Sequence, residues 1–327
     1  MTKSQQKSSN KPLTQSYFSH GKLLITGEYL VLDGATALAI PTKKGQEMKV
    51  DMFPGSGNIH WTAKDVNGNI WLNISFILQG THLISVALGK LASSTEVVLL
   101  KKIVENAIKL NPNFLDTQTD YEIITHLQFA NNWGLGSSST LIANMAKWAE
   151  VDAMQLFFKA MEGSGYDVAM AVEAQPILYH IENNNPHWKV ITYNPTFAEQ
   201  LFFVHLGQKQ NSRNEIANYK TKAKPSLALI ERISSLTNLI VECKDIKTFE
   251  NLILEHEAIL SEILRTPSIK QRLFSDYPGA IKSLGAWGGD FILASGIEPT
   301  SYFQSKGYTT TLSWNEMVKS EEIQEAN

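Results

Sequence analysis

The stretch Gly134-Leu135-Gly136-Ser137-Ser138-Ser139-Thr140 restricts most strongly how this 327-residue chain can fold. It lies between segment 121–129, which has strand character, and segment 141–151, whose apolar residues fall on one face of a helix. Glycines let backbone N–H groups approach an anion closely, and the following helix adds unpaired donors and its positive dipole end. The sequence therefore predicts a strand–loop–helix phosphate site without the Gly-Lys-Ser/Thr ending of the Walker motif. A flexible Gly/Ser turn is the alternative reading.

Strands and helices are mixed along the rest of the chain without strict βαβ alternation, which predicts an α+β protein. A turn at Asp33-Gly34 is expected to join paired strands, and the breaker Asn183–Pro186 is expected to open a boundary region. Ser93 and Glu96 resemble a capping box at the start of a helix. The other expected strands are 23–25, 29–32, 37–40, 47–53, 70–76, 177–181, 189–193, 201–205 and 291–294, and the other expected helices are 94–108, 153–161, 168–174 and 249–264.

Composition excludes several classes of function. The formal net charge of −3 and the absence of a long Lys/Arg run argue against a nucleic-acid-binding surface. No run approaches the roughly 20 apolar residues of a membrane span. The single cysteine, Cys243, cannot form an internal disulfide, which favours a cytoplasmic location. The polar ends, residues 1–13 and 320–327, are predicted to be mobile.

Three ordered segments together resemble the motifs of the GHMP kinases, the family of galactokinase, homoserine kinase, mevalonate kinase and phosphomevalonate kinase. Segment 20–32 (HGKLLITGEYLVL) is similar to the first motif, in which Gly-Lys precedes a strand and Gly-Glu follows it. Gly-Leu-Gly-Ser-Ser at 134–138 is similar to the second motif, and segment 282–290 (KSLGAWGGD) to the Gly-rich third motif. The chain is thereby identified as a GHMP kinase homologue over both of its halves.

The resemblance implies a two-lobed α+β fold with the active site in the cleft between the lobes. Residues 1–190 would form a ribosomal-protein-like, ATP-binding lobe, and residues 191–327 a ferredoxin-like lobe. ATP and Mg²⁺ are the implied cofactors, a small molecule is the implied partner, and the protein could act as a homodimer. The implied nucleotide-binding residues are Asn132, Gly134, Leu135, Gly136, Ser137, Ser138 and Ser139, with Ser138 also on the metal.

Asp167 and Lys22 are the implied catalytic residues. Asp167 in Gly-Ser-Gly-Tyr-Asp-Val-Ala matches the element that supplies the catalytic carboxylate in mevalonate and phosphomevalonate kinases. It would align the acceptor hydroxyl with the γ-phosphate, while Lys22 would neutralise phosphate charge and pair with Asp167. From the residues alone, an aspartate such as Asp167 at a helix N-terminus is usually a helix cap, and a lone lysine before a strand, such as Lys22, is normally a solvated charge.

The same comparison favours mevalonate or phosphomevalonate as the acceptor. Alternatives are a sugar or amino-alcohol acceptor, a diphosphomevalonate decarboxylase, and a catalytically silent ligand-binding homologue. Glu28 could equally be an edge-strand charge, and segment 207–213, with Arg213 as a further contact, could equally be an exposed polar loop. The implied substrate-binding residues are Glu28, Tyr29, Lys209, Ser212, Gly285, Gly288 and Gly289.

The chain departs from the family pattern at three places. The proline that usually opens the second motif is missing from segment 129–132, and Trp287 replaces a glycine of the third motif, which should hinder phosphate wrapping there. Leu156 occupies the spacing at which many members carry a magnesium-binding glutamate, so Mg²⁺ is expected on Ser138 and the nucleotide phosphates. His256, on the apolar stripe of its helix, is expected to be buried.

Overall fold

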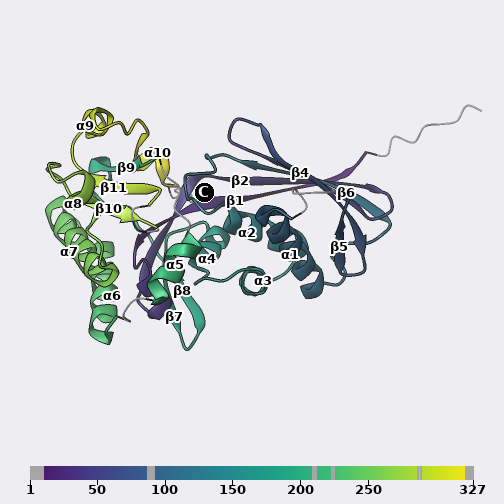
Figure 1. Cartoon of the computed structure of the whole chain (residues 1–327), viewed down its shortest axis with the longest axis horizontal. Coiled ribbons are helices and arrows are strands. Elements are labelled where there is room, and N and C mark those ends of the chain that lie inside the picture. Colours follow the sequence, from purple (N-terminus) through teal and green to yellow (C-terminus); the bar gives the residue numbers. More distant parts are fainter. Residues whose placement is uncertain are drawn as a thin grey trace, which may run out of the picture.

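The computed structural model of the chain describes residues 11–86, 93–207, 212–221, 225–285, 287 and 289–320, without the side chains of residues 212–214 and 218. It is an α+β structure with two sheets, as predicted, and the two sheets are built from different parts of the sequence (Figure 1). Strands up to Val190 form the larger sheet and strands from Leu201 onward form the smaller one. A division into two lobes at residues 190 and 191 stays a prediction.

The larger sheet has eight strands in the order β5-β4-β3-β6-β2-β7-β8, with β1 paired to β2. All of its pairings are antiparallel except that of β3 with β6. The long strands β1 and β2 run from this sheet toward the smaller one, and their shared end carries the first sequence motif. The strands are β1 (Leu13–Thr26), β2 (Ala37–Pro54), β3 (Asn58–Lys64), β4 (Ile70–Gln79), β5 (His82–Ser85), β6 (Thr119–Leu127), β7 (Ile177–Glu182) and β8 (Asn185–Val190).

Four helices cover one face of the larger sheet (Figure 1). Their apolar stripes and the inward side chains of the sheet form one core, and the predicted inward positions of α1, such as Val97 and Leu100, are buried there. The cap of α1 is Ser94, whose side chain accepts the Val97 N–H, one residue later than the predicted Ser93. These helices are α1 (Thr95–Leu110), α2 (Ser137–Ala149), α3 (Ala153–Ala160) and α4 (Tyr166–Glu173).

The smaller sheet has the antiparallel order β10-β11-β9-β12. Helix α7 packs against β10 and against α6 (Figure 1). Apolar residues at the ends of β1 and β2, including Ile25 and Ile40, share a core with Phe203 and Phe291, so the two sheets are joined by buried apolar contacts. The strands are β9 (Leu201–His205), β10 (Ile281–Leu284), β11 (Phe291–Ser295) and β12 (Thr311–Ser313), and the helices are α5 (Ser212–Thr221), α6 (Leu227–Glu242), α7 (Ile246–Leu264), α8 (Ile269–Leu273), α9 (Thr300–Ser305) and α10 (Trp314–Met317).

The hairpin predicted at the Asp33-Gly34 turn was wrong, whereas the chain does turn at the predicted breaker. Segment 30–33 is a 3-10 helix, η1 (Leu30–Asp33), and not a strand of a hairpin, because β1 already pairs directly with β2 and the intervening chain must loop across their end. The breaker at 183–186 is the tight turn of the β7–β8 hairpin, with Asn183 and Asn184 in the left-handed region, so the larger sheet continues beyond it. The strand expected at 189–193 is β8, which ends at Val190, and β3 was not predicted.

The chain ends lie largely outside the described residues, but Leu13, predicted to be mobile, begins β1. Among the helices that the structure describes, none is long and apolar enough to cross a membrane.

Candidate active site

The Gly/Ser loop ends in the first turn of α2. Gly136 is the N-cap of this helix and has a left-handed backbone with φ of 85°, which a glycine adopts without a steric penalty. The first N–H of the turn with an intrahelical acceptor is that of Thr140, which donates to the Gly136 carbonyl at 3.0 Å. The N–H groups of Ser137, Ser138 and Ser139 precede it and have no carbonyl one turn back. This end of α2 therefore presents backbone donors, hydroxyls and a positive dipole end, as the sequence predicted.

Lys22 of β1 lies against this loop. Its N–H donates to the Leu135 carbonyl at 3.0 Å, and a Cβ added at Gly136 would be 3.2 Å from Lys22 Cγ. The Lys22 Nζ lies 5.4 Å from the centre of the Tyr166 ring. Burial lowers the pKa of Lys22, but the Tyr166 hydroxyl and the Asp167 carboxylate outweigh it, so the pKa ends above its ordinary value. Lys22 therefore brings a fixed positive charge to the start of α2.

Asp167 lies in the first turn of α4, beside the start of α2. Its Oδ2 accepts a hydrogen bond from the Ser139 hydroxyl, and its Oδ1 accepts one from the Val168 N–H at 3.1 Å. The Asp167 carboxylate raises the pKa of Lys22 through its charge, without a direct ion-pair contact between the two side chains in the described part of the chain. The carboxylate is oriented by Ser139, a partner that the sequence did not reveal.

A cavity of about 690 Å³ joins these groups. Its wall includes Lys22, the loop 134–139, Asp167, and from the smaller sheet's connections Gly285 and Asp290. Asp290 packs against the loop so closely that a Cβ added at Gly134 would overlap its carboxyl group. The cavity is therefore formed by all three sequence motifs together.

Not every predicted nucleotide or acceptor residue reaches this cavity. Asn132 is exposed and does not line it, and its carbonyl accepts a hydrogen bond from His205 Nε2 at 3.1 Å. Gly289 is buried but is not part of the wall. Lys209 and Gly288 lie outside the described residues, and Ser212 begins α5 without a described side chain.

Glu28 and Tyr29, both predicted to bind substrate, line the cavity. Glu28 is buried and 2.6 Å from Lys282 Nζ, so it is not an edge-strand charge. The Tyr29 hydroxyl accepts a hydrogen bond from the backbone N–H of Trp287 at 2.6 Å. Trp287 itself is buried in an apolar cluster with Tyr29 and Tyr219 and does not line the cavity. The bulky side chain of the third motif thus packs into the core and away from the cavity wall, and the expected hindrance of phosphate wrapping stays a prediction.

A second arm of the cavity lies between α1 and strands β3 and β4. Trp61, Trp71 and Leu72 line it from the strands, and Glu96 and Leu99 line it from the helix. Trp71 is 41% exposed although it is a large aromatic side chain. A flat apolar ligand can stack there, with Glu96 as a hydrogen-bond acceptor.

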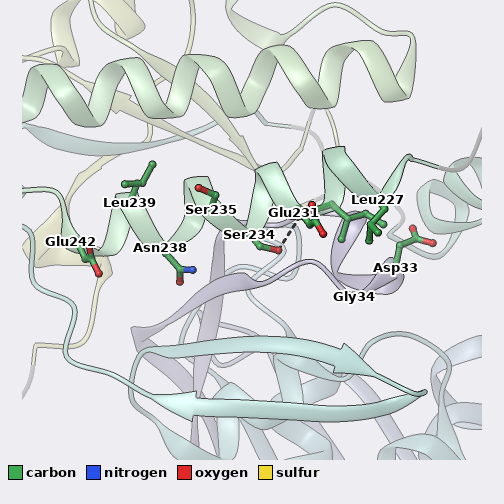
Figure 2. A pocket seen from close by; sticks show the side chains of 10 residues that line it. Asp33, Gly34, Leu227, Glu231, Ser234, Ser235, Asn238, Leu239 and Glu242 are labelled. Carbon is green, nitrogen blue, oxygen red and sulfur yellow. Dashed lines mark hydrogen bonds between the residues drawn. The ribbon is translucent and has the colours of Figure 1, made fainter.

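A different pocket, of about 570 Å³, runs along the outer side of α6 (Figure 2). Ser234 in its wall accepts the Thr36 N–H at 3.0 Å and donates to the Ile230 carbonyl at 2.9 Å. Its ionisable wall residues are Asp33, Glu231 and Glu242. All three are acidic and the described wall has no cation, which disfavours a phosphate, so the candidate site is the cavity at the start of α2.

Comparison with known proteins then gives the fold. No family model and no curated protein sequence matches the chain. The structure is similar to Streptococcus pneumoniae phosphomevalonate kinase in complex with phosphomevalonate and AMPPNP (TM-score 0.65, 14% identity, 91% of this chain and 99% of that chain). It is also similar to L. major mevalonate kinase in complex with R-mevalonate (TM-score 0.63, 14% identity, 91% and 92%) and to Lactococcus lactis galactokinase complexed with galactose (TM-score 0.63, 11% identity, 92% and 93%). The chain has the GHMP kinase fold.

The predicted α+β class and GHMP kinase fold are thus confirmed. These three neighbours bind different acceptors, so the GHMP kinase fold by itself does not select one. The sequence did not reveal Tyr166 beside Lys22, or Asp290 against Gly134. Tyr166 lies in segment 163–169 and Asp290 ends segment 282–290, and both segments were already compared with the family motifs. An ionisable side chain within a Gly-rich segment was the signal that could have indicated these two residues.

Proposed function

We propose that the protein is an ATP-dependent kinase that phosphorylates a small molecule. The observation that carries this proposal is the convergence of three groups on one cavity: the N-terminus of α2, Lys22 and Asp167. Phosphoryl transfer depends on positioning and on neutralising charge rather than on covalent chemistry by the protein, and these groups supply both.

In this proposal the N–H groups of Ser137, Ser138 and Ser139 bind the phosphates, and Lys22 neutralises the charge that develops on them. Asp167, oriented by the Ser139 hydroxyl, accepts a hydrogen bond from the acceptor hydroxyl and aligns it for attack. The base of the nucleotide would stack in the arm that Trp71 lines.

The residues present fit a magnesium ion with few protein ligands. The usual glutamate spacing is occupied by Leu156, an apolar residue that is fully buried in α3. Among the residues that the structure describes, no group of three or more His, Cys, Asp or Glu side chains could hold a metal ion. The Ser138 hydroxyl and the Asp167 carboxylate line the cavity as oxygen donors, which suits an ion that keeps several waters. When bound, Mg²⁺ would neutralise phosphate charge.

Mevalonate or phosphomevalonate is the proposed acceptor, on the resemblance of segments 20–32 and 163–169 to that branch. One observation favours a neutral acceptor such as a sugar instead. The described wall of the cavity carries a single cation, Lys22, and six carboxyl groups, which are Glu28, Glu96, Glu162, Asp167, Glu215 and Asp290. An acidic acceptor needs cations that this part of the wall does not supply, and Lys209 and Arg213 are the proposed source.

The test is ADP release from ATP with mevalonate, phosphomevalonate and a panel of sugars and amino alcohols, with Asp167→Asn as the control. We expect one acceptor class to stimulate ADP release, and Asp167→Asn to lower kcat by about 10²–10⁴-fold. Release of carbon dioxide together with ADP would indicate a decarboxylase. If no acceptor stimulates ADP release, or if the variant turns over its acceptor as fast as the wild type, the proposal fails.

The proposed location is the cytoplasm, because Cys243 is a buried free thiol.

A further inference from the structure

Four ionisable side chains form a buried cluster where the end of β1 meets α7 and β10. The cluster consists of Glu28, His256, Glu257 and Lys282, each at most 2% exposed. Lys282 Nζ lies 2.6 Å from Glu28 Oε1 and 3.3 Å from Glu257 Oε1, and it donates to the Ser283 carbonyl at 3.0 Å. Of the four, only Glu28 also lines the cavity.

His256 in the cluster is neutral and its tautomer is fixed. Burial, and then the Lys282 charge, hold the pKa of His256 well below its ordinary value. His256 Nε2 accepts the Gly27 N–H at 3.0 Å, so the ring proton is on Nδ1. Nε2 therefore carries no proton that it could donate to Glu28 Oε2, which lies 3.6 Å away. An ionised Oε2 would receive no hydrogen bond from this ring.

The charges of the cluster do not balance if both carboxyls are ionised. One ammonium would then face two carboxylates among buried side chains, which leaves a buried net charge of −1. One proton shared by Glu28 and Glu257 makes the cluster neutral. Glu28 Oε2 and Glu257 Oε2 are both buried without a hydrogen-bond partner, so each has room for that proton. Burial is also the main cause that raises the pKa of Glu257 and raises the pKa of Glu28 to about 7.

We propose that Lys282, Glu257 and His256 are positioning residues that hold Glu28, and with it the segment 27–29 of the cavity wall, in place for the acceptor, with one proton shared between the two carboxyls. The positioning role rests on the proposed kinase function, because that function identifies the ligand. The shared proton does not depend on it. Lys282 fixes one oxygen of Glu28, and His256 fixes the backbone of Gly27 just before it.

The groups that face Glu28 come from three elements and from the next residue in sequence. They are His256 and Glu257 of α7, Lys282 of β10, Tyr29 next in sequence, and Tyr166 of α4. The two phenols remain neutral at physiological pH because burial raises the pKa of each. Only the carboxyls of Glu28 and Glu257 therefore exchange a proton near pH 7, and the apparent pKa of this step is a property of the pair.

The first experiment measures the shared proton directly in the full chain without any ligand. The carboxyl carbons of ¹³C-labelled glutamates are titrated by NMR in the wild type, in Glu28→Gln and in Glu257→Gln. We expect one titration near pH 7 in the wild type, far above the value of about 4.3 for an unperturbed glutamate. Both variants should lose it, because the remaining carboxyl forms a balanced ion pair with Lys282. Absence of the step in the wild type, or its persistence in Glu257→Gln, would overturn the shared proton.

The second experiment tests positioning by steady-state kinetics with the acceptor that the ADP-release panel identifies. Lys282→Met and Glu28→Gln should each raise the acceptor KM about tenfold, equivalent to roughly 1.4 kcal/mol, with the KM for ATP nearly unchanged. The double variant should be no worse than either single variant, because both changes remove the same interaction. Glu257→Gln keeps the side-chain shape and serves if Lys282→Met does not fold.

Lys306→Met is the matched control, since Lys306 pairs with Asp276 at 3.0 Å on the exposed surface and should leave both KM values unchanged. Equal increases in the KM for the acceptor and the KM for ATP would show that the cluster is purely structural and would refute the positioning role. Additive effects of the two substitutions on the acceptor KM in the double variant would refute it as well. If the wild type releases no ADP with any acceptor, the kinase function and the positioning role both fail, whereas the NMR titration still decides the shared proton.

Discussion

Replacing Gly134 by alanine should separate the phosphate loop from the third motif. Gly134 has φ of 65°, and an added Cβ would overlap the Asp290 carboxyl group and lie 2.9 Å from its Cβ. Gly285 offers a matched control, because it has φ of 73° and nothing within 4 Å of an added Cβ. Both substitutions place a side chain in the left-handed region, at a cost of about 1–2 kcal/mol. Only the first must also displace Asp290, which adds about 1–3 kcal/mol of overpacking.

The assay combines urea unfolding with calorimetric titration of Mg·ATP. We expect Gly285→Ala to lower the free energy of unfolding by about 1–2 kcal/mol, and Gly134→Ala to lower it by roughly 2–5 kcal/mol. ATP affinity should fall about tenfold or more in Gly134→Ala, because a displaced loop that weakens binding by about 1.4 kcal/mol already lowers the affinity tenfold. It should change less in Gly285→Ala. The same loss of stability and affinity in both variants would refute the contact between the loop and Asp290.

Three further predictions concern hydrogen bonds and pH. Ser139→Ala removes the hydrogen bond to Asp167, so kcat should fall about tenfold at constant ATP KM, a loss near 1–1.5 kcal/mol; an unchanged kcat would mean that Asp167 needs no orientation. Tyr29→Phe leaves the Trp287 N–H buried without an acceptor, so urea unfolding should show a loss of about 1–3 kcal/mol, and a neutral effect would argue against that bond. Folding raises the pKa of Glu28 from 4.5 to about 7, so between these pH values the folded state keeps a proton that the unfolded state loses. The free energy of unfolding of the wild type should therefore fall by on the order of 3 kcal/mol as pH rises from about 4.5 to about 7, and Glu28→Gln should abolish this loss. Parallel pH–stability curves for the two proteins would contradict that linkage.

The elements that bind phosphate were predictable because their signals are local. The apolar periodicity of α2, the strand before it and the glycines between them all fall within about thirty residues, and backbone sterics at Gly136 act on neighbouring atoms. The inward positions of α1 and α7 followed from the same periodicity. His256 was expected to be buried, and it is, but its bond to Gly27 N–H was not foreseen.

The sequence by itself determined the α+β class, the loop and helix at 134–149, and the buried stripes of the long helices. Only the tertiary structure decided which ionisable groups meet: Lys282 reaches Glu28 across 254 residues, and Asp167 finds Ser139 on another helix. Local propensity depends on a few neighbouring dihedral angles, so it can be read along the chain. A contact between distant segments depends on how both sheets and their helices pack, and only that packing places Glu28 between a cavity and a buried ammonium ion.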